Sequence, residues 1–405
     1  MTENPTTSSR LISIDALRGA AALAVVFFHA TNQARFLGAQ GTPRWLGVSV
    51  ATVLSFGYIG VYLFFVISGF CIHLRWAKAK AAGKEPSIDF FAFWRRRIRR
   101  LYPPYLIAMC FYMVVLAVMG HLQLTNFFWL DLGSHLLMLH NFNNQTAYGI
   151  NGVFWTLAIE EQLYLAYFLL IALRVRFGWV KTLAVCLAAR LAWFALSFIL
   201  VRKFGYGLPV TEAALAQWFV WALGALSIEA ALGIVKLPGW CRDLRLGMFV
   251  LLLTATFAYL DRFWDPRGLA HELWWVVVHP LWGIAFFIII NRAATAERVW
   301  RTTKRMPRVV TAFAGVGLFS YSLYLTHELI LDHLAKYLTT IFQWPRSTML
   351  LISLFILSAI SVLFAWVFFW LFEKPFISWA QASSKTAPVL KEEPAPILKE
   401  EQAQT

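Results

Sequence analysis

Long apolar runs that alternate with short charged loops constrain this chain more than any other feature of its sequence. They occur at residues 11–33, 51–74, 101–119, 154–173, 182–201, 212–234, 246–260, 273–291, 309–334 and 348–372. As helices, nearly all of them can cross the roughly 30 Å of hydrocarbon in a bilayer, and only the seventh is short. Because 60% of the residues are hydrophobic and 14% are charged, a soluble fold would expose large apolar patches. We therefore predict an all-α, polytopic transmembrane helix bundle of about ten spans.

Lysine and arginine residues are concentrated in alternate loops. The loops after the second, fourth, sixth and eighth runs hold most of them. Since positive residues are enriched on the cytoplasmic side of short loops, ten spans place both termini in the cytoplasm. We expect a cytoplasmic segment at 1–10, a membrane domain at 11–374 and a disordered cytoplasmic tail at 375–405, where Lys, Glu, Pro and Ala dominate. The expected location is the inner (cytoplasmic) membrane.

The net charge of +15 points to anionic partners. Because the basic residues lie between apolar runs, lipid headgroups or a phosphorylated cosubstrate are favoured over nucleic acid. The four cysteines lack metal-ligand spacing, so we expect neither disulfides nor a metal site. The first run is long and follows a polar start, which predicts a retained span rather than a cleaved signal peptide. The largest outer loop, 120–152, carries His121, His135 and His140 and is expected to lie at or re-enter the interface.

The first apolar run contains ionisable side chains, which are unfavourable in lipid by a few kcal/mol unless they have a partner, a water-filled cavity or a function. Arg18 and His29 are 11 positions apart, or roughly 16 Å along one face of a helix. Asp15 precedes Arg18 by three residues and is expected to pair with it. A buried His29 is expected to be neutral and able to accept a proton. The alternative is a snorkelling arginine and a packed histidine.

The fourth run begins after Asn151 and includes Trp155, followed by adjacent carboxylates at Glu160 and Glu161. Two neighbouring residues of a helix cannot face the same direction, so one carboxylate is expected to turn inward and the other toward the interface. The alternative is a pair of carboxylates on the outer surface of the protein.

Polar residues also occur in the fifth and ninth runs. Tyr324 and His327 are three residues apart in the ninth, so they share one face of a helix. Arg190 lies midway along the fifth run without an acidic partner in its own helix. Glu229 or Glu212 is the expected partner.

The loop before the third run is the most basic segment of the chain. Five arginines occupy the six positions 95–100. Orientation in the membrane alone accounts for some of this charge. However, the cluster exceeds what orientation requires, and the guanidinium fork suits bidentate capture of phosphates.

These segments together resemble the acyltransferase 3 family, the membrane O-acyltransferases that modify bacterial polysaccharides, glycolipids and some small molecules. The resemblance covers nearly the whole membrane domain and rests on segments in a fixed order: IDALRGAAALAVVFFHA, FFVISGFCIHLR, RRRIRRLYPPY, LHNFNN, INGVFWTLAIEEQLYL, SYSLYLTH and FEKPF. It implies a ten-span bundle and a short-chain acyl-CoA, with acetyl-CoA as the expected co-substrate and no tightly bound cofactor. Thr326 and Glu328 depart from the aromatic residues that commonly flank the histidine of the ninth span in this family.

The resemblance assigns roles to individual residues. It places the family's arginine and histidine of the first span on Arg18 and His29, its glutamate on Glu160, and its basic cluster on Arg96, Arg97 and Arg100. We expect His29 to be the general base, with Glu160 orienting its ring, and the arginines to hold coenzyme A phosphates. Asn151, Trp155, Tyr324 and His327 are expected on the side of the acceptor, a hydroxylated sugar, glycolipid or other compound. The competing hypothesis is a transporter or flippase for a lipid-linked sugar or acyl compound, in which the same charges line a path.

Overall fold

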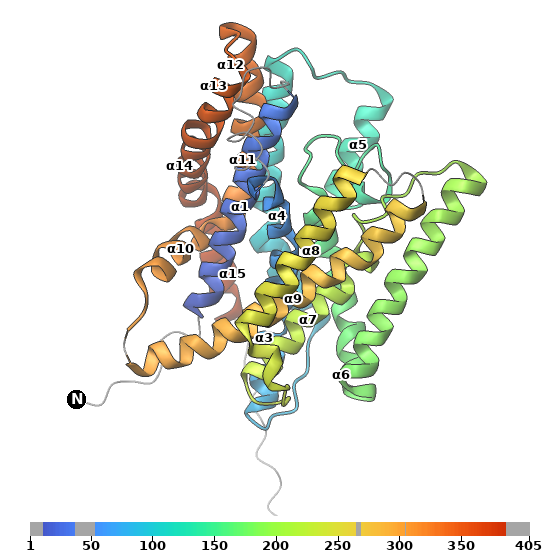
Figure 1. Cartoon of the computed structure of the whole chain (residues 1–405), viewed down its shortest axis with the longest axis vertical. Coiled ribbons are helices and arrows are strands. Elements are labelled where there is room, and N and C mark those ends of the chain that lie inside the picture. The colour runs from blue at the N-terminus through green and yellow to red at the C-terminus, as the bar shows by residue number, and fades with distance from the viewer. Residues whose placement is uncertain (1–10, 37–52, 265–268, 304, 386–405) are drawn as a thin grey trace, which may run out of the picture.

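The computed structural model describes residues 11–36, 53–264, 269–303 and 305–385, and these ranges contain helices and connecting segments without a β-strand (Figure 1). The α-helices are α1 (Ile12–Phe36), α3 (Gly60–Ala81), α4 (Phe90–Val118), α5 (Asn126–Leu136), α6 (Trp155–Phe204), α7 (Ala214–Ala231), α8 (Leu244–Trp264), α9 (Leu269–Thr303), α10 (Arg308–Leu318), α11 (Ser320–Glu328), α12 (Ala335–Phe342), α13 (Arg346–Leu351), α14 (Ser358–Phe368) and α15 (Lys374–Lys385). The all-α prediction is confirmed.

Several helices are suited to crossing a membrane. Within the described residues, seven are long and apolar enough, or eight if the bent pair α10 and α11 counts as one span. The apolar part of α8, Leu244–Leu260, is shorter, as the sequence indicates. The chain is therefore a multi-span membrane protein, while the count of ten and the cytoplasmic location of both termini stay predictions.

Helix α6 joins the two predicted runs at 154–173 and 182–201 in a single element of 50 residues. A straight helix of that length would measure about 75 Å, more than twice the thickness of the hydrocarbon layer. Gly178 breaks it with φ 74° and ψ 174°, a conformation that is accessible to glycine because it has no Cβ. The chain turns at this residue, so α6 consists of a first arm before Gly178 and a second arm after it.

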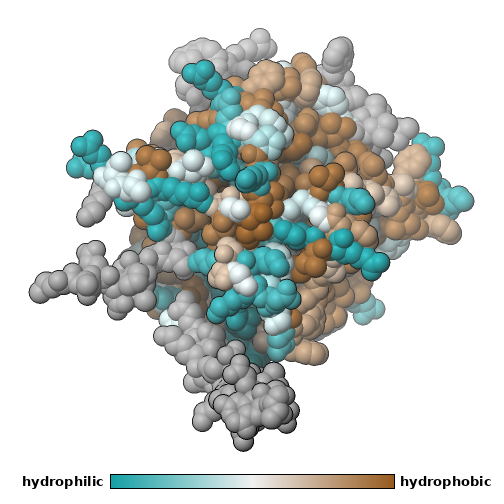
Figure 2. All heavy atoms as spheres, turned by 90° about the horizontal axis from the view of Figure 1, so that it is seen from below, coloured by the Kyte–Doolittle hydropathy of each residue, from teal (hydrophilic) through white to brown (hydrophobic). Residues whose placement is uncertain are grey.

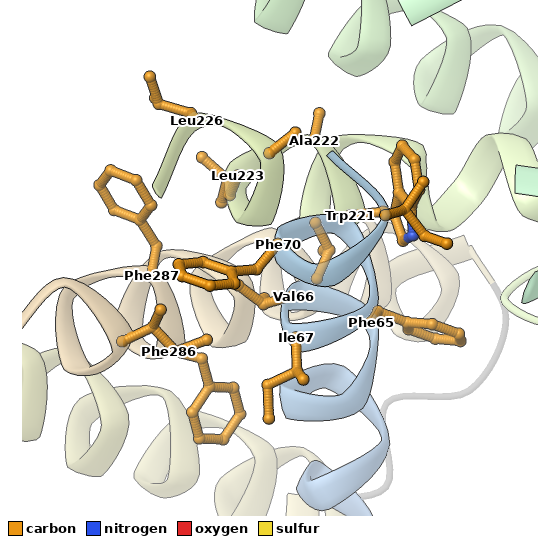
Figure 3. Close-up of a cluster of buried hydrophobic side chains, with 14 of the residues drawn as sticks. Phe65, Val66, Ile67, Phe70, Trp221, Ala222, Leu223, Leu226, Phe286 and Phe287 are labelled. Atoms are coloured by element: carbon orange, nitrogen blue, oxygen red, sulfur yellow. The ribbon is translucent and has the colours of Figure 1, made fainter. Parts of the chain in front are cut away.

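A core of large apolar side chains joins α3, α7 and α9. Figure 3 shows its central members, which are Phe65, Val66, Ile67 and Phe70 of α3, Trp221, Ala222, Leu223 and Leu226 of α7, and Phe286 and Phe287 of α9. Two glycines bring α3 and α7 into backbone contact. A Cβ on Gly69 would lie 2.0 Å from the carbonyl oxygen of Trp221, and a Cβ on Gly224 would lie 1.9 Å from that of Val66. Small residues at such contacts are typical of helix packing in membranes.

Helices α1 and α10 are held together in the same way. A Cβ on Gly19 would lie 2.0 Å from the carbonyl oxygen of Phe313, and a Cβ on Gly317 would lie 2.0 Å from that of Asp15. The chain bends by 63° between α10 and α11. This bend brings the start of α11 to the middle of α1, and it builds one wall of the site described below.

Arg190, in the second arm of α6, is fully buried and binds backbone carbonyl groups. Its Nε donates to Val276 at 3.0 Å, its Nη2 donates to Trp275 at 2.7 Å, and its Nη1 donates to Ala216. Pro280 follows Val276 by four residues in α9 and has no N–H. The carbonyl of Val276 therefore lacks its helical donor and accepts a hydrogen bond from Arg190 instead.

The prediction that Arg190 pairs with Glu229 or Glu212 is therefore wrong. The carboxylate of Glu229 accepts hydrogen bonds from Nε and Nη2 of Arg174 at 2.8 and 2.7 Å, and it lies 2.9 Å from Nε2 of His73. Glu229 thus ties α7 to α3 and to the first arm of α6, while the guanidinium of Arg190 joins α6 to α7 and α9 through the main chain.

The loop between α4 and α6 forms α5 and a short 3-10 turn, His140–Phe142. The side chain of Thr125 caps α5 by accepting the N–H of Phe128 at 3.3 Å. His135 and His140 are buried, and their rings stack with centroids 3.9 Å apart. Burial and the neighbouring His135 lower the pKa of His140 to about 3, so this ring is neutral at pH 7. Whether the loop re-enters the interface stays a prediction.

The expected start of the disordered tail at residue 375 is wrong. The last span continues through a π-helical turn, Phe369–Glu373, into α15, which ends at Lys385. Helix α15 packs on α4, where the guanidinium of Arg99 lies 4.7 Å from the ring centroid of Trp379. The remaining tail, 386–405, and the expected N-terminal segment, 1–10, lie outside the described residues.

Candidate functional site

A cavity of about 150 Å³ lies where α1, α3, α4 and α6 meet the bend between α10 and α11. Its charged lining residues are Arg18, Arg97, Arg100, Glu160 and Glu373. Figure 2 views the molecule from the end at which α1 begins and α3 ends, and hydrophilic residues gather across that face between hydrophobic flanks. We call the cavity lined by Arg18, Arg97 and Arg100 the arginine cavity.

Arg18 enters the arginine cavity from α1. Its Nη1 lies 3.4 Å from the carboxylate of Asp15, which confirms the predicted pair. Its Nη2 lies 3.3 Å from the sulfur of Cys71 on α3. Asp15 therefore neutralises only part of the guanidinium, and the remaining donors are available to a ligand.

Arg97 and Arg100 reach the same cavity from α4. This helix begins after Asp89, and the side chain of Asp89 caps it by accepting the N–H of Ala92 at 3.0 Å. They are three residues apart, so they share one helix face. The guanidinium of Arg97 lies 5.6 Å from the ring centroid of Tyr164. The Nε of Arg100 is buried, and no described residue accepts a hydrogen bond from it. A buried donor without an acceptor is unfavourable, so this position suits an anion.

The two adjacent glutamates of α6 diverge, as the sequence predicts, whereas the expected position of the second carboxylate at the interface stays a prediction. Glu160 turns into the arginine cavity, where it accepts hydrogen bonds from Ser68 at 2.7 Å and from the hydroxyl of Tyr164. Glu161 is 9% exposed and lies 3.3 Å from the indole nitrogen of Trp94. The inward carboxylate is therefore held by α3 and by its own helix.

Glu373 is a second carboxylate of the arginine cavity that sequence reasoning missed. It is 3% exposed and accepts hydrogen bonds from the backbone N–H of Ser322, at 3.1 Å, and from the Ser322 hydroxyl. Its position inside the FEKPF segment at the end of the last apolar run is the signal that identifies it. Glu373 joins the last span to the start of α11.

A larger groove of about 680 Å³ adjoins the arginine cavity on the side where α3 ends and α4 begins. Cys71, Ile72 and Arg97 line both spaces, so the two adjoin. The basic lining residues of the groove are Arg75, Lys84, Arg95, Arg96, Arg97 and Arg99. The structure therefore places Arg96 in the groove and Arg100 in the cavity, with Arg97 in both.

His29 lies at the other end of α1 from Arg18 and faces the end of α11. Its Nδ1 is 3.1 Å from Oε1 of Glu328, and its ring centroid is 4.9 Å from that of His327. Glu160 contacts Ser68 and Tyr164 instead, so the structure does not bring it together with His29. Whether Glu160 takes part in catalysis stays a prediction.

Tyr324 lies between the arginine cavity and the His29 region. Its hydroxyl accepts a hydrogen bond from Thr156 at 2.7 Å and donates to the carbonyl of Val153 at 3.1 Å, and both Tyr324 and Thr156 line the cavity. The ring of Tyr324 is 5.7 Å from that of His327, which places them side by side as predicted. This contact joins α11 to the start of α6 at the boundary of the arginine cavity, and His29 is not among the residues that line this cavity.

The other residues expected on the acceptor side lie close to this contact in sequence but differ in environment. Asn151 is buried, and its side-chain oxygen accepts the N–H of Val153 at 2.7 Å. Trp155 is half-buried and packs against the core shared by α3, α7 and α9. Asn151 therefore shapes the turn before α6, while Trp155 contributes to packing.

The fold and this arrangement of buried charges define a polytopic membrane protein with polar chambers inside its helix bundle. Residues 11–370 match the acyltransferase 3 family, described as an acyltransferase domain. The match covers most of the chain, and the chain belongs to this family.

Sequence relatives include bacterial acyltransferases. The peptidoglycan O-acetyltransferase OatA of Listeria monocytogenes is 31% identical over 187 residues, which are 42% of this chain and 25% of OatA. The acyltransferase MdmB of Streptomyces mycarofaciens is 26% identical over 340 residues, which are 80% of each chain. The putative peptidoglycan O-acetyltransferase YrhL of Bacillus subtilis is 34% identical over 155 residues, 34% of this chain and 24% of YrhL. The aligned region thus spans about a quarter of OatA and of YrhL. No solved structure matches the chain.

Proposed function

We propose that this protein is an O-acetyltransferase of the bacterial cytoplasmic membrane, which moves an acetyl group from an acyl-CoA to a hydroxyl group of a cell-wall sugar of the peptidoglycan type. Family membership supports the reaction class. The names of OatA and YrhL support the acceptor class. The transporter hypothesis is not favoured, because the whole membrane domain matches an acyltransferase family.

The donor assignment rests on one observation, the buried Nε of Arg100 without an acceptor among the described residues, in a cavity that Arg18 and Arg97 also line. Coenzyme A carries phosphates, which guanidinium groups bind through charge-assisted hydrogen bonds. In this proposal Arg96 and Arg97 bind phosphates along the groove, and Arg100 and Arg18 bind at the cavity. The roughly 16 Å between Arg18 and His29 is comparable to an extended pantetheine arm. The thioester would pass Tyr324 to reach His29.

The chemical step needs a base and no redox partner. The acceptor hydroxyl gives its proton to a ring nitrogen of His29 while its oxygen attacks the carbonyl carbon of the thioester. The new C–O bond forms, the C–S bond breaks, and the coenzyme A thiolate takes the proton back from the imidazolium. The products are an acetyl ester and free coenzyme A, so atoms and charge balance.

The test of the donor site is acetyl-CoA binding to the purified protein in lipid nanodiscs. Arg97→Ala is expected to weaken binding about tenfold or more, because a charge-assisted hydrogen bond contributes about 1.5–3 kcal/mol. Arg176→Ala is the matched control, since Arg176 is an exposed arginine whose guanidinium lies over Phe177, away from the cavity. Equal affinity of the Arg97 variant and the control would refute the phosphate site.

The test of the reaction is release of free coenzyme A from acetyl-CoA in the presence of peptidoglycan fragments. His29→Gln is expected to lower the rate on the order of 100-fold, the contribution of a general base. A transporter would release no coenzyme A in this assay. Release without ester formation on the sugar would overturn the acceptor assignment.

A further inference from the structure

Glu328 is a partly buried carboxylate beside His29, and the family resemblance gives it no role. It is the last residue of α11, and its Oε1 lies 3.1 Å from Nδ1 of His29 on α1. The side chains of His29 and Glu328 are only 19% and 14% exposed. Gly152, in the turn before α6, lies beside this carboxylate, since a Cβ on Gly152 would lie 3.4 Å from both of its oxygens. Three segments that are distant in the sequence therefore meet at Glu328.

With Glu328 ionised, the contact determines which nitrogen of His29 is protonated. An ionised carboxylate only accepts hydrogen bonds, so Nδ1 of a neutral His29 then carries the hydrogen that points to Glu328. The lone pair is then on Nε2, which is the nitrogen left to accept a proton from a substrate. In a catalytic triad, a carboxylate orients the histidine and holds it in one tautomer in the same way.

His327 lies beside this pair without competing for the carboxylate. Its Nδ1 is 3.1 Å and 2.9 Å from the carbonyl oxygens of Leu323 and Tyr324, which only accept, so Nδ1 of His327 carries its hydrogen. Its ring is therefore tied to its own helix. The charged and titratable groups that face the His29 ring from α11 are thus Glu328 and His327, and only Glu328 accepts a hydrogen bond from it.

The helix is irregular next to Glu328. A π-helical segment, Leu329–Leu334, begins directly after Glu328, and such segments are frequent at functional sites. Asp332, one turn further on, pairs with Lys336 at 2.8 Å and not with His29. The two carboxylates on neighbouring turns therefore have different partners: Asp332 pairs with Lys336, and Glu328 pairs with His29, the candidate base.

We propose that Glu328 is the positioning residue of His29, which holds Nδ1–H and stabilises the imidazolium that forms when Nε2 takes the proton of the acceptor. This role deepens the proposed function and rests on His29 being the base. It replaces the role that sequence reasoning gave to Glu160. Because Glu328 touches the base and not the reacting atoms, its loss should slow turnover and leave donor binding unchanged.

The kinetic test uses acetyl-CoA and peptidoglycan fragments with the full chain in nanodiscs. Glu328→Gln is expected to lower kcat on the order of 100-fold with an unchanged KM for acetyl-CoA, and Glu328→Asp is expected to recover part of the loss. Asp332→Asn is the matched control and should keep the kcat of the parent. If Glu328→Gln keeps kcat while His29→Gln abolishes turnover, the positioning role is overturned and the proposed function stands. If His29→Gln remains active, both are overturned.

A second measurement does not depend on activity. Nitrogen-15 NMR of histidine-labelled protein in lipid vesicles reports which ring nitrogen carries hydrogen, and the His29→Gln variant identifies the signals of His29. We expect an Nδ1–H tautomer in the parent and a loss of this preference in Glu328→Gln. An Nε2–H tautomer in the parent would overturn the proposal, whatever the kinetics.

Discussion

The contact between Arg190 and the main chain yields a quantitative prediction. Arg190→Met keeps a long side chain but removes the donors to three carbonyl groups. Val276 has no helical donor because of Pro280, and an unsatisfied buried acceptor costs about 1–3 kcal/mol. The other two carbonyls lose charged donors, a loss partly offset because a guanidinium no longer has to be buried. We expect the free energy of unfolding to fall by about 2–4 kcal/mol.

A second substitution tests whether the carbonyl of Val276 is the cause of this destabilisation. Pro280→Ala restores an N–H at the position that can donate to the carbonyl of Val276, so it should compensate for the loss of Arg190. In a double-mutant cycle, the Arg190→Met and Pro280→Ala changes should be coupled by about 1–3 kcal/mol. The assay is unfolding by SDS in mixed micelles, followed by tryptophan fluorescence. Arg202→Met is the control, since Arg202 is an exposed arginine of the same helix. If Arg190→Met is equally damaging with and without Pro280, the carbonyl argument is refuted.

Three further predictions use the same unfolding assay. Gly69→Ala should destabilise the protein by about 3 kcal/mol, because its Cβ would lie 2.0 Å from the carbonyl oxygen of Trp221; a cost below 1 kcal/mol would show that α3 and α7 can separate. Tyr324→Phe should cost about 1 kcal/mol, and much less once Thr156→Val has removed its donor; full additivity would contradict their hydrogen bond. Because its folded pKa of about 3 is below the unfolded value near 6.5, His140 should destabilise the protein as the pH falls from 6.5 toward 3, by up to about 1.4 kcal/mol per pH unit. His140→Leu should weaken that dependence, and an unchanged pH profile would exclude His140 as its cause.

Periodicity and charge were sufficient to predict the helical membrane bundle, because hydrophobic length is a local property of the sequence. The Asp15–Arg18 pair and the divergence of Glu160 from Glu161 were also predictable, since both follow from helix geometry alone. The break in α6 is visible in the sequence only as Gly178 between two apolar runs.

Contacts between distant segments were not predictable. Arg190 binds carbonyl oxygens, which every residue has, so no acidic side chain marks its partner; Pro280 is the only local clue. Glu328 follows His327 in the sequence, yet its partner is His29, and their contact depends on the bend between α10 and α11. The resemblance also directed attention to Glu160, because an aromatic residue commonly stands in the family pattern where this chain has Glu328.

The glycine contacts bring the backbone of α1 against that of α10, and the backbone of α3 against that of α7. Arg18 on α1, and Ser68 and Cys71 on α3, therefore lie on helices that are closely packed against a neighbour. Helix α4, which carries Arg97 and Arg100, contains no glycine and two consecutive prolines, Pro103 and Pro104. If the arginine cavity widens to admit coenzyme A, we expect α4 to move outward. Spin labels on α4 and α3 should then report a distance change on ligand addition, while labels on α1 and α10 should not.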